Sequence, residues 1–270
     1  MDEPILHIVV LALVQGITEF LPISSYGHLR LAQMYIGAPE QGLILIVALH
    51  VGSLGAVMVY FWRDLWAMAL GLGQLAKGRG GPNARLVIHV AVATIPVIFG
   101  GIVVNQFDPR GIQSLAVIAW ATFGFGILLY VADRIGMTVR RTEHLHLIDA
   151  VIIGCAQTLA LVPGTSRSGI TMSAARLLGM ERTETARFSM MLSIPAILGA
   201  GILKSRDLLA MDDVQLTAAA LMAAGLAFIA ALVTITAMMA WLKRATFTPF
   251  VVYRLLLGGF LLALIYGWAE

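Results

Sequence analysis

The apolar chain is broken twice, by Pro22-Ile23-Ser24-Ser25-Tyr26-Gly27-His28 and by Pro163-Gly164-Thr165-Ser166-Arg167-Ser168-Gly169. The apolar runs before these breaks, residues 5–21 and 147–162, are short for a membrane crossing. Each proline removes a helical hydrogen bond and disfavours helix in the residue before it. Irregular backbone at membrane depth survives only where protein buries it or where it lines a wet cavity. Each stretch therefore predicts a half-membrane helix that ends at a cavity.

The composition is typical of a membrane protein. The 270 residues are 59% hydrophobic and 12% charged, with a mean hydropathy of +0.89. We expect one integral membrane domain over residues 1–270, with a retained N-terminus because no basic leader or cleavage site precedes the first polar motif. The net charge of +3 comes from basic residues in loops, which predicts no nucleic-acid partner. A single cysteine, Cys155, excludes an intrachain disulfide.

Six further apolar runs are long enough to cross a bilayer, which takes about 17 to 25 residues. They cover residues 43–62, 86–104, 114–132, 188–203, 216–242 and 251–268. With the two half-length runs, they predict an all-α polytopic membrane protein that has about six membrane-spanning helices and two re-entrant helical hairpins.

Basic residues set the expected orientation, because cytoplasmic loops collect lysine and arginine. Three loops are basic and one is acidic. The basic loops carry Arg63, Lys77, Arg79 and Arg85, then Arg134, Arg140 and Arg141, then Lys243 and Arg244, whereas the acidic loop carries Asp207, Asp212 and Asp213. With the basic loops inside, the second hairpin enters from the cytoplasm and the first hairpin from the opposite face.

Hairpins of opposite orientation predict an inverted-topology repeat, over residues 1–135 and 145–270. Weak internal similarity supports this pairing. Gln15 and Gln157 precede Pro22 and Pro163 by seven and six residues, and Ser24-Ser25 matches Thr165-Ser166. Inverted repeats place a site near the midplane where broken helices meet, and the N-termini of half-helices attract anions. The sequence thus predicts a site for an anionic group between the hairpins.

A carboxylate lies just before the first break. Glu19 follows Gln15 by about one helical turn, so the two side chains share a helix face. An ionisable group at membrane depth is costly and indicates function, ordinarily metal coordination or proton transfer for a carboxylate. The alternative is a hydrogen-bonded tertiary anchor. We predict Glu19 as a catalytic residue, Glu19 and Gln15 as metal ligands, and Gln15 also as a substrate contact.

The first break itself places two hydroxyls and an imidazole within five residues, at Ser24, Ser25 and His28. These groups can supply a nucleophile, a base and hydrogen bonds to phosphate. The alternative is that Ser24 or Ser25 only caps the returning helix. We predict Ser25 and His28 as catalytic residues, and Ser24, Tyr26 and Gly27 as substrate-binding residues.

The second break is typical of a phosphate-binding turn. Arg167 is suited to bidentate recognition of phosphate oxygens and can neutralise charge that develops during phosphoryl transfer. The alternative is an arginine that reaches out to the membrane surface. We predict Arg167 as catalytic. The expected substrate-binding residues around it are Gly164, Thr165, Ser166, Ser168, Gly169 and Thr171.

The other histidines do not form a metal motif. His7, His50 and His89 lie in apolar runs, where a packed histidine is more common than a ligand, and only His50 is expected near the site. His144 and His146 accompany charged residues in a loop, which predicts a solvated surface.

Segments 15–28 and 163–171 closely resemble the two signatures of the bacitracin-resistance (BacA-type) undecaprenyl pyrophosphate phosphatases. Residues 248–254 and the chain length extend the likeness to essentially the whole chain. The family's paired acidic or amide positions fall on Gln15 and Glu19, its serine and histidine on Ser25 and His28, and its phosphate-binding arginine on Arg167. One departure is Tyr26, where the family usually has threonine, and Gln15 leaves Glu19 as the pair's only carboxylate.

The resemblance implies hydrolysis of undecaprenyl diphosphate to the monophosphate lipid carrier and orthophosphate, assisted by a divalent cation such as Mg²⁺ or Ca²⁺. In that family the reaction recycles the carrier for peptidoglycan and cell-wall synthesis and confers bacitracin resistance. The implied partners are the lipid substrate and the lipids of the bacterial inner membrane, with the site open to the periplasmic face. The oligomeric state stays open, a homodimer included.

Two questions stay open at this stage. Either Ser25 attacks phosphorus with Glu19 as base and His28 as proton donor, or His28 is the nucleophile. A secondary transporter or flippase of a prenyl-phosphate lipid would also explain inverted hairpins. The phosphatidate phosphatase type is excluded, because Ser173 and Leu177 occupy the places of its histidine and aspartate. A prenyl tail must leave sideways into lipid, which predicts an apolar cleft reaching the hairpins.

Overall fold

The computed structural model describes residues 5–36, 43–106, 113–209 and 218–267, and these residues form α-helices joined by turns. The helices α1 to α5 are Ile5–Thr18, Ser25–Ile36, Leu43–Tyr60, Trp62–Ala76 and Pro82–Gln106. The helices α6 to α11 are Leu115–Ile135, Leu147–Thr158, Arg167–Leu177, Arg182–Leu209, Ala218–Leu242 and Thr248–Tyr266. Two short 3₁₀ turns, Thr142–His144 and Leu159–Leu161, flank α7. The all-α prediction is confirmed.

Within the described residues, five helices are long and apolar enough to cross a membrane, and a sixth crossing results if the bent pair α3–α4 counts as one. All six predicted runs fall on these helices, although residues 216–217 and 268, like Asp212 and Asp213, lie outside the described part of the chain. The structure therefore confirms a polytopic membrane protein.

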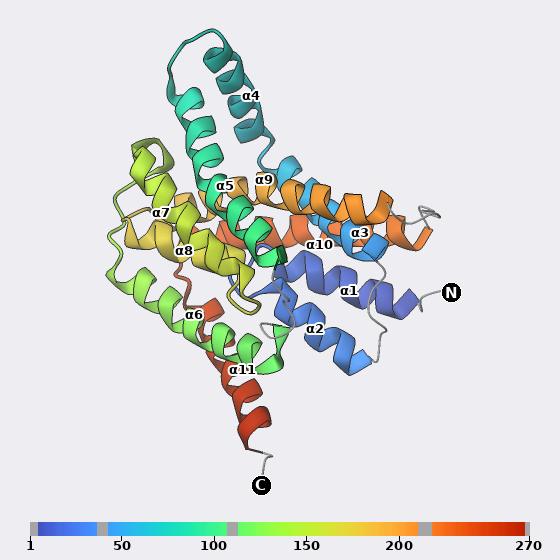
Figure 1. The fold of residues 1–270 in the computed structure, drawn as a ribbon. Helices are drawn as coiled ribbons and strands as arrows, with labels where there is room; N and C mark the ends of the chain where they lie inside the picture. The colour runs from blue at the N-terminus through green and yellow to red at the C-terminus, as the bar shows by residue number, and fades with distance from the viewer. Residues whose placement is uncertain (1–4, 37–42, 107–112, 210–217, 268–270) are drawn as a thin grey trace.

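The sequence did not predict α4. After Tyr60 the chain bends by 82° and continues as a second helix, where charged residues had indicated a loop. The charges are few: Arg63 and Asp64 open α4 and the rest of the helix is largely apolar, so it packs along α5. This pair projects from the body of the molecule (Figure 1).

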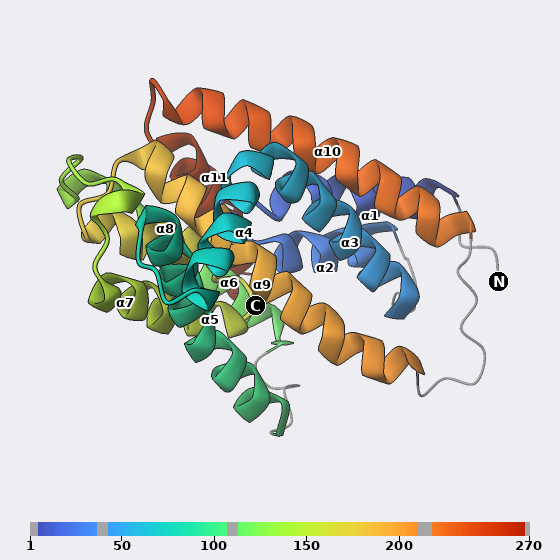
Figure 2. The same ribbon diagram turned by 90° about the horizontal axis from the view of Figure 1, so that it is seen from above.

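Both half-length helices are present as predicted. In Figure 1 the pair α1–α2 lies to the right, the pair α7–α8 to the left, and the two breaks meet in the middle. Seen from above, α10 and α3 run side by side with α9 next to α3 (Figure 2). The hairpins thus approach each other from opposite sides inside a shell of longer helices.

The packing supports the inverted repeat, which stays a prediction. α1 packs on α10 and α7 packs on α5, and each contact has a glycine at its closest point. A Cβ on Gly16 would lie 2.7 Å from the Ala227 carbonyl oxygen, and one on Gly154 would lie 2.6 Å from that of Ala93. Larger side chains at either glycine would push the half-helix away from its neighbour.

The two breaks share one backbone design. Ser24 and Ser166 have positive φ, at 76° and 71°, a strained conformation for a residue with a side chain. Each serine Oγ accepts a hydrogen bond from the backbone N–H three residues later, in Gly27 and Gly169. This equivalence aligns Gln15 with Gln157, but it pairs Ser24 with Ser166, so the expected match of Ser24 with Thr165 was one residue out. The difference arises because Ser24 follows Pro22 by two residues, whereas Ser166 follows Pro163 by three.

Arg254 of α11 joins the two breaks. Its side chain is fully buried and donates hydrogen bonds to backbone carbonyls only. The acceptors are Pro22 of the first break, Gly164 and Thr165 of the second, and Ala121 and Thr122 of α6, at 2.9 to 3.3 Å. Because the Pro22, Gly164 and Thr165 carbonyls lie outside any helix, Arg254 supplies hydrogen bonds that a helix would otherwise provide.

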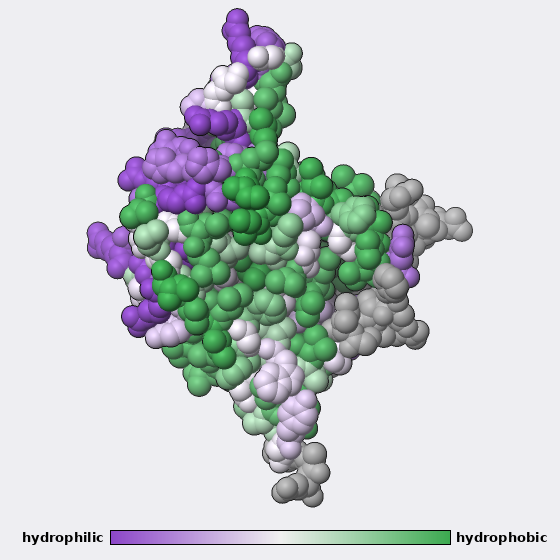
Figure 3. All heavy atoms as spheres, turned by 60° about the vertical axis from the view of Figure 1, so that its left-hand side comes forward, coloured by the Kyte–Doolittle hydropathy of each residue, from purple (hydrophilic) through white to green (hydrophobic). Residues whose placement is uncertain are grey.

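The surface agrees with a membrane location. Figure 3 shows hydrophobic side chains over the middle of one face and hydrophilic ones along its upper and left edges. Large apolar side chains are freely exposed on several helices, among them Trp66, Phe99 and Leu256. Exposure on this scale is expected where lipid, and not water, contacts the protein.

We predict that Arg254→Met lowers the free energy of unfolding by about 3 kcal/mol or more, because it leaves several buried carbonyls without donors. Thermal unfolding of the detergent-purified protein measures the change. The matched control is Arg244→Met, at an exposed loop arginine. Equal stability of the two variants would contradict the role of Arg254.

Candidate functional site

Glu19 lies at the end of the first half-helix, beyond the last residue of α1. Its Oε2 accepts hydrogen bonds from Ser25 Oγ at 2.7 Å and from Gln15 Nε2 at 3.1 Å. The break at Ser24 brings Ser25 back onto the carboxylate that precedes it. A hydroxyl that donates to a buried carboxylate has the arrangement of a nucleophile with its base.

Arg167 brings the second hairpin to the same point. Its Nη2 lies 3.2 Å from Glu19 Oε1, and the two side chains are 15% and 8% exposed. Arg167 is the first residue of α8, directly after the left-handed Ser166, and its Nη1 donates to the Ser189 carbonyl at 3.4 Å. One carboxylate therefore holds a hydroxyl on one oxygen and a guanidinium on the other.

A cavity of about 380 Å³ opens at this cluster. Most of its polar lining comes from the two breaks and its apolar lining from α5, α9 and the 3₁₀ turn after α7. The lining residues are Glu19, Ser24, Ser25, Tyr26, His50, Val97, Val104, Gln113, Ala160, Leu161, Val162, Pro163, Gly164, Ser166, Arg167, Ala196, Ile197 and Ala200. Seven of these are predicted site residues: Glu19, Ser24, Ser25, Tyr26, Gly164, Ser166 and Arg167.

Other predicted site residues lie behind the cavity wall and hold it in place. Ser168 Oγ donates to the Leu21 carbonyl at 2.8 Å, which ties the second break to the first. Thr171 and Ser189 share a hydrogen bond of 2.6 Å beneath Arg167. Gln15, Gly27, Thr165 and Gly169 are likewise buried and absent from the lining. Substrate contact by these six residues stays a prediction.

His28 does not line the cavity. Its Nδ1 lies 2.6 Å from the Ser24 carbonyl oxygen and its Nε2 lies 2.6 Å from the Tyr253 hydroxyl, and the two rings stack. Because a carbonyl only accepts, Nδ1 carries the proton and Nε2 accepts from Tyr253. Both ring nitrogens therefore have partners, one of them the carbonyl of the strained Ser24, and a catalytic role of His28 stays a prediction.

Sequence reasoning missed the roles of Arg254 and Tyr253. An arginine inside an apolar run is itself a signal of a structural or functional role. Charged residues at membrane depth are rare, and they pair with another charge or with backbone carbonyls. No sequence signal reveals that Tyr253 faces His28, because the contact joins residues that are far apart in the chain.

The site offers oxygen atoms to a hard cation. The Glu19 carboxylate lies beside Gln15, whose Oε1 is buried without a hydrogen-bond partner. Among the described residues, no group of three His, Cys, Asp or Glu side chains could hold a metal ion. Mg²⁺ is commonly bound by one or two carboxylates, with water and phosphate oxygens as its other ligands. The residues therefore fit a divalent cation that a bound phosphate helps to hold.

An apolar groove of about 350 Å³ adjoins the cavity, between α3 and α9. It shares His50, Ile197 and Ala200 with the cavity. The rest of the groove consists of Ile46, Val47, Val51, Leu54, Leu198, Gly201 and Ile202. The structure thus contains the apolar cleft that the sequence predicted.

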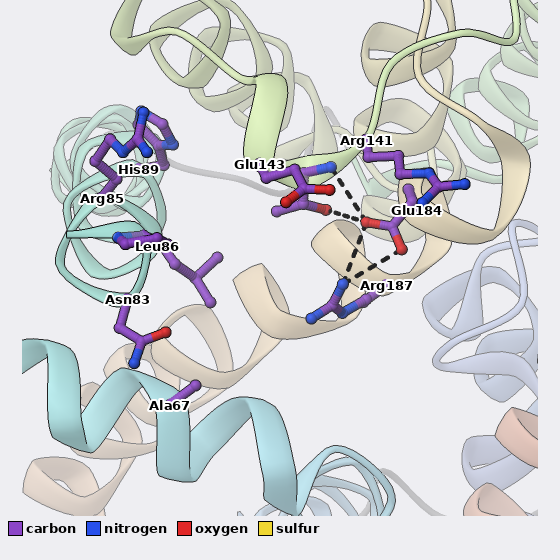
Figure 4. Close-up of a pocket in the computed structure, with 11 residues that line it drawn as sticks. Ala67, Asn83, Arg85, Leu86, His89, Arg141, Glu143, Glu184 and Arg187 are labelled. Atoms are coloured by element: carbon purple, nitrogen blue, oxygen red, sulfur yellow. Dashed lines mark hydrogen bonds and ion pairs between the residues drawn. The ribbon is translucent and has the colours of Figure 1, made fainter.

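A second cavity, of about 280 Å³, lies between α4, the start of α5 and the start of α9. Figure 4 shows Arg85 and His89 on one side of it and Arg141, Glu184 and Arg187 on the other. Glu184 accepts from Thr142 and Arg187, Arg187 also pairs with Asp64, and Arg141 pairs with Glu181. The Thr142 hydroxyl donates to the Glu184 carboxylate at 2.7 Å, so this cavity also holds a hydroxyl on a base. We do not take it as the catalytic site, because it shares no residue with the apolar groove between α3 and α9.

Comparison with known proteins gives concordant results. The family model for bacitracin resistance protein BacA matches residues 8–260. The chain is 52% identical to undecaprenyl-diphosphatase 1 of Rhodospirillum rubrum, over 97% of this chain and 95% of the relative. It is 47% identical to the undecaprenyl-diphosphatase of Jannaschia sp., over 96% of this chain and 97% of the relative. It is 45% identical to the undecaprenyl-diphosphatase of Roseobacter denitrificans, over 97% of this chain and 98% of the relative.

We predict that Gly169→Ala destabilises the protein by about 1 to 3 kcal/mol through overpacking. The new Cβ would lie 2.8 Å from Arg254 Nη1 and 3.2 Å from Ser166 Oγ. It would therefore disturb both the hydrogen bonds of Arg254 to the two breaks and the cap that Ser166 forms on α8. Thermal unfolding measures the change. Gly199→Ala is the control, because nothing lies within 4 Å of its added Cβ. A Gly169→Ala variant as stable as the control would contradict this account.

Proposed function

The chain belongs to the bacitracin resistance protein BacA family, and we propose that it hydrolyses undecaprenyl diphosphate to undecaprenyl phosphate and orthophosphate. This makes it a membrane phosphatase that returns the lipid carrier to peptidoglycan and cell-wall synthesis. Bacitracin resistance follows from the same activity. The relatives carry the name of this enzyme over nearly the whole length of the chain.

One observation carries the proposal. A carboxylate, a hydroxyl and a guanidinium converge at a polar cavity, and that cavity continues into an apolar groove. A lipid diphosphate has matching parts, since its anionic head needs cations and hydrogen-bond donors and its prenyl chain needs apolar surface. The groove between α3 and α9 is the place we assign to the chain nearest the head.

Ser25 is the nucleophile in this proposal. Its Oγ donates to Glu19 at 2.7 Å, so the carboxylate can take the proton as Oγ attacks the terminal phosphorus. Arg167 contacts the phosphate oxygens and stabilises the charge that develops on them. The N-terminus of α8 adds backbone N–H groups and a positive dipole end.

The hydrogen bonds of His28 favour Ser25 over His28 as the nucleophile. Attack by His28 would require a free ring nitrogen in the cavity, whereas its two nitrogens contact Ser24 and Tyr253. We assign His28 to positioning, because its bond to the Ser24 carbonyl supports the turn from which Ser25 projects.

A divalent cation, Mg²⁺ or Ca²⁺, is part of the proposal. Glu19 and Gln15 would hold it together with diphosphate oxygens, as the donor set of the site allows. When bound, the cation supplies positive charge that offsets the negative charge of the phosphates.

We place the cavity on the periplasmic side of the inner membrane. The cavity lies at the later residues of α5 and α9, including Val104 and Ala200, whereas basic residues such as Arg85 and Arg141 lie near the opposite ends. Basic loops stay in the cytoplasm, so a cavity at the other ends opens outward.

A transporter or flippase is not favoured. Transport alone needs no hydroxyl held on a carboxylate, and the relatives are named diphosphatases.

We predict that Ser25→Ala lowers the rate of phosphate release from undecaprenyl diphosphate by about 10³-fold or more, because the nucleophile is lost. Orthophosphate release by the purified protein in detergent measures this. Ser114→Ala is the control, since Ser114 caps α6 and is not one of the residues that line the cavity. Phosphoenzyme trapped on His28, or near-normal turnover by Ser25→Ala, would contradict the assignment.

We also predict that a chelator suppresses phosphate release at least about tenfold and that added Mg²⁺ or Ca²⁺ restores it. The same assay on Gln15→Glu should show half-maximal activation at lower metal concentration, because a second carboxylate strengthens the site. Full activity in excess chelator would remove the cation from the proposal.

A further inference from the structure

We propose that His50 is a further catalytic residue, which donates a proton to the departing prenyl phosphate and later accepts one from the attacking water. This inference rests on the proposed diphosphatase activity and assigns a residue that the two signature motifs do not contain. It starts from the position of His50 in α3, opposite both hairpins.

His50 lies where three spaces meet. It lines the polar cavity with Glu19, Ser25 and Arg167, and it also lines the apolar groove between α3 and α9. A third hollow, beside Tyr26 and Arg30, again includes His50 in its wall. A diphosphate in the cavity with its chain in the groove must therefore place its inner phosphate near His50. The oxygen that bridges the two phosphates is the atom on which negative charge develops.

The backbone determines which ring nitrogen faces the substrate. His50 Nδ1 lies 2.8 Å from the Ile46 carbonyl oxygen. Because a carbonyl only accepts, Nδ1 carries the proton and donates a hydrogen bond to that oxygen. For Nε2, the described residues provide no hydrogen-bond partner. The ring is half-buried, and Nε2 is the atom left to meet a ligand.

Charged groups line the same spaces as His50. Glu19 and Arg167 line the cavity, and Arg30 lines the adjoining hollow. A bound diphosphate would add several negative charges beside the ring. An imidazole can donate or accept a proton near neutral pH, so one residue can serve in both halves of the reaction.

In the first half-reaction, Ser25 Oγ forms a bond to the terminal phosphorus and the bond from that phosphorus to the bridging oxygen breaks. The Ser25 proton passes to Glu19. The bridging oxygen leaves with the electron pair of the broken bond and takes the proton from His50 Nε2. The products of this step are phosphoserine, protonated Glu19, neutral His50 and protonated prenyl phosphate.

In the second half-reaction, water attacks the phosphoserine phosphorus and the bond to Ser25 Oγ breaks. Neutral His50 accepts a proton from the water, and Glu19 returns its proton to Ser25 Oγ. Orthophosphate leaves, and all three side chains regain their starting protonation states. The cycle consumes one water molecule and needs no other reactant.

The test compares His50→Gln and His50→Ala with the parent in the orthophosphate assay with undecaprenyl diphosphate. Glutamine can donate a hydrogen bond but cannot transfer a proton, so we expect kcat to fall by about 10²-fold with KM changed by less than about threefold. Added imidazole should restore part of the turnover of His50→Ala, because the missing ring leaves space beside the cavity. A merely structural role would give no such rescue.

His89→Gln is the matched control, since His89 is a buried histidine in α5 that lines the second cavity instead. It should keep the parent's kcat. A His50→Gln variant with the parent's kcat, or a folded His50→Ala variant that imidazole does not rescue, would overturn the role of His50 alone. A parent that releases no phosphate would overturn the diphosphatase function itself, and the two failures are thus distinguishable.

Discussion

The structure depends on one buried arginine. Two half-length helices end at breaks, where the carbonyls of Pro22, Gly164 and Thr165 lie outside any helix. Arg254 donates to carbonyls of both breaks and of α6 from a single planar group. A guanidinium suits this task because its donors point in several fixed directions at once and it keeps its charge. Glu19, Ser25 and Arg167 lie in or beside the two breaks. The position of Arg254 therefore determines where these three side chains meet.

The site divides its roles between two hairpins of similar backbone. Ser24 and Ser166 adopt the same left-handed conformation and cap the same way, so the residues that follow them, Ser25 and Arg167, occupy equivalent positions. One hairpin presents a hydroxyl and the other a guanidinium, and Glu19 contacts both. The two hairpins thereby bring two different groups to the Glu19 carboxylate, whereas identical hairpins would bring the same group twice. The function follows from this asymmetry.

The local features were predictable and the long-range ones were not. Pro22, Pro163 and the polar residues after them revealed the half-helices, because proline and unpaired backbone have strict requirements in lipid. The short motifs also identified Glu19, Ser25 and Arg167, which the structure brings together. The sequence could not place His28 against Tyr253, since that contact depends on how distant helices pack. The expectation that His50 lies near the site is confirmed, because His50 lines the cavity. The helix α4 was missed because Arg63 and Asp64 resembled loop residues, although the segment after them is apolar enough to be helical.

The most direct test is an experimental structure of the protein with a non-hydrolysable prenyl diphosphate analogue that has a methylene bridge. We predict that the terminal phosphonate lies against Arg167 and within reach of Ser25 Oγ, that the bridge lies near His50, and that the prenyl chain follows the groove between α3 and α9. A head group bound in the second cavity beside Arg85, or a chain that leaves between other helices, would contradict the account of the site.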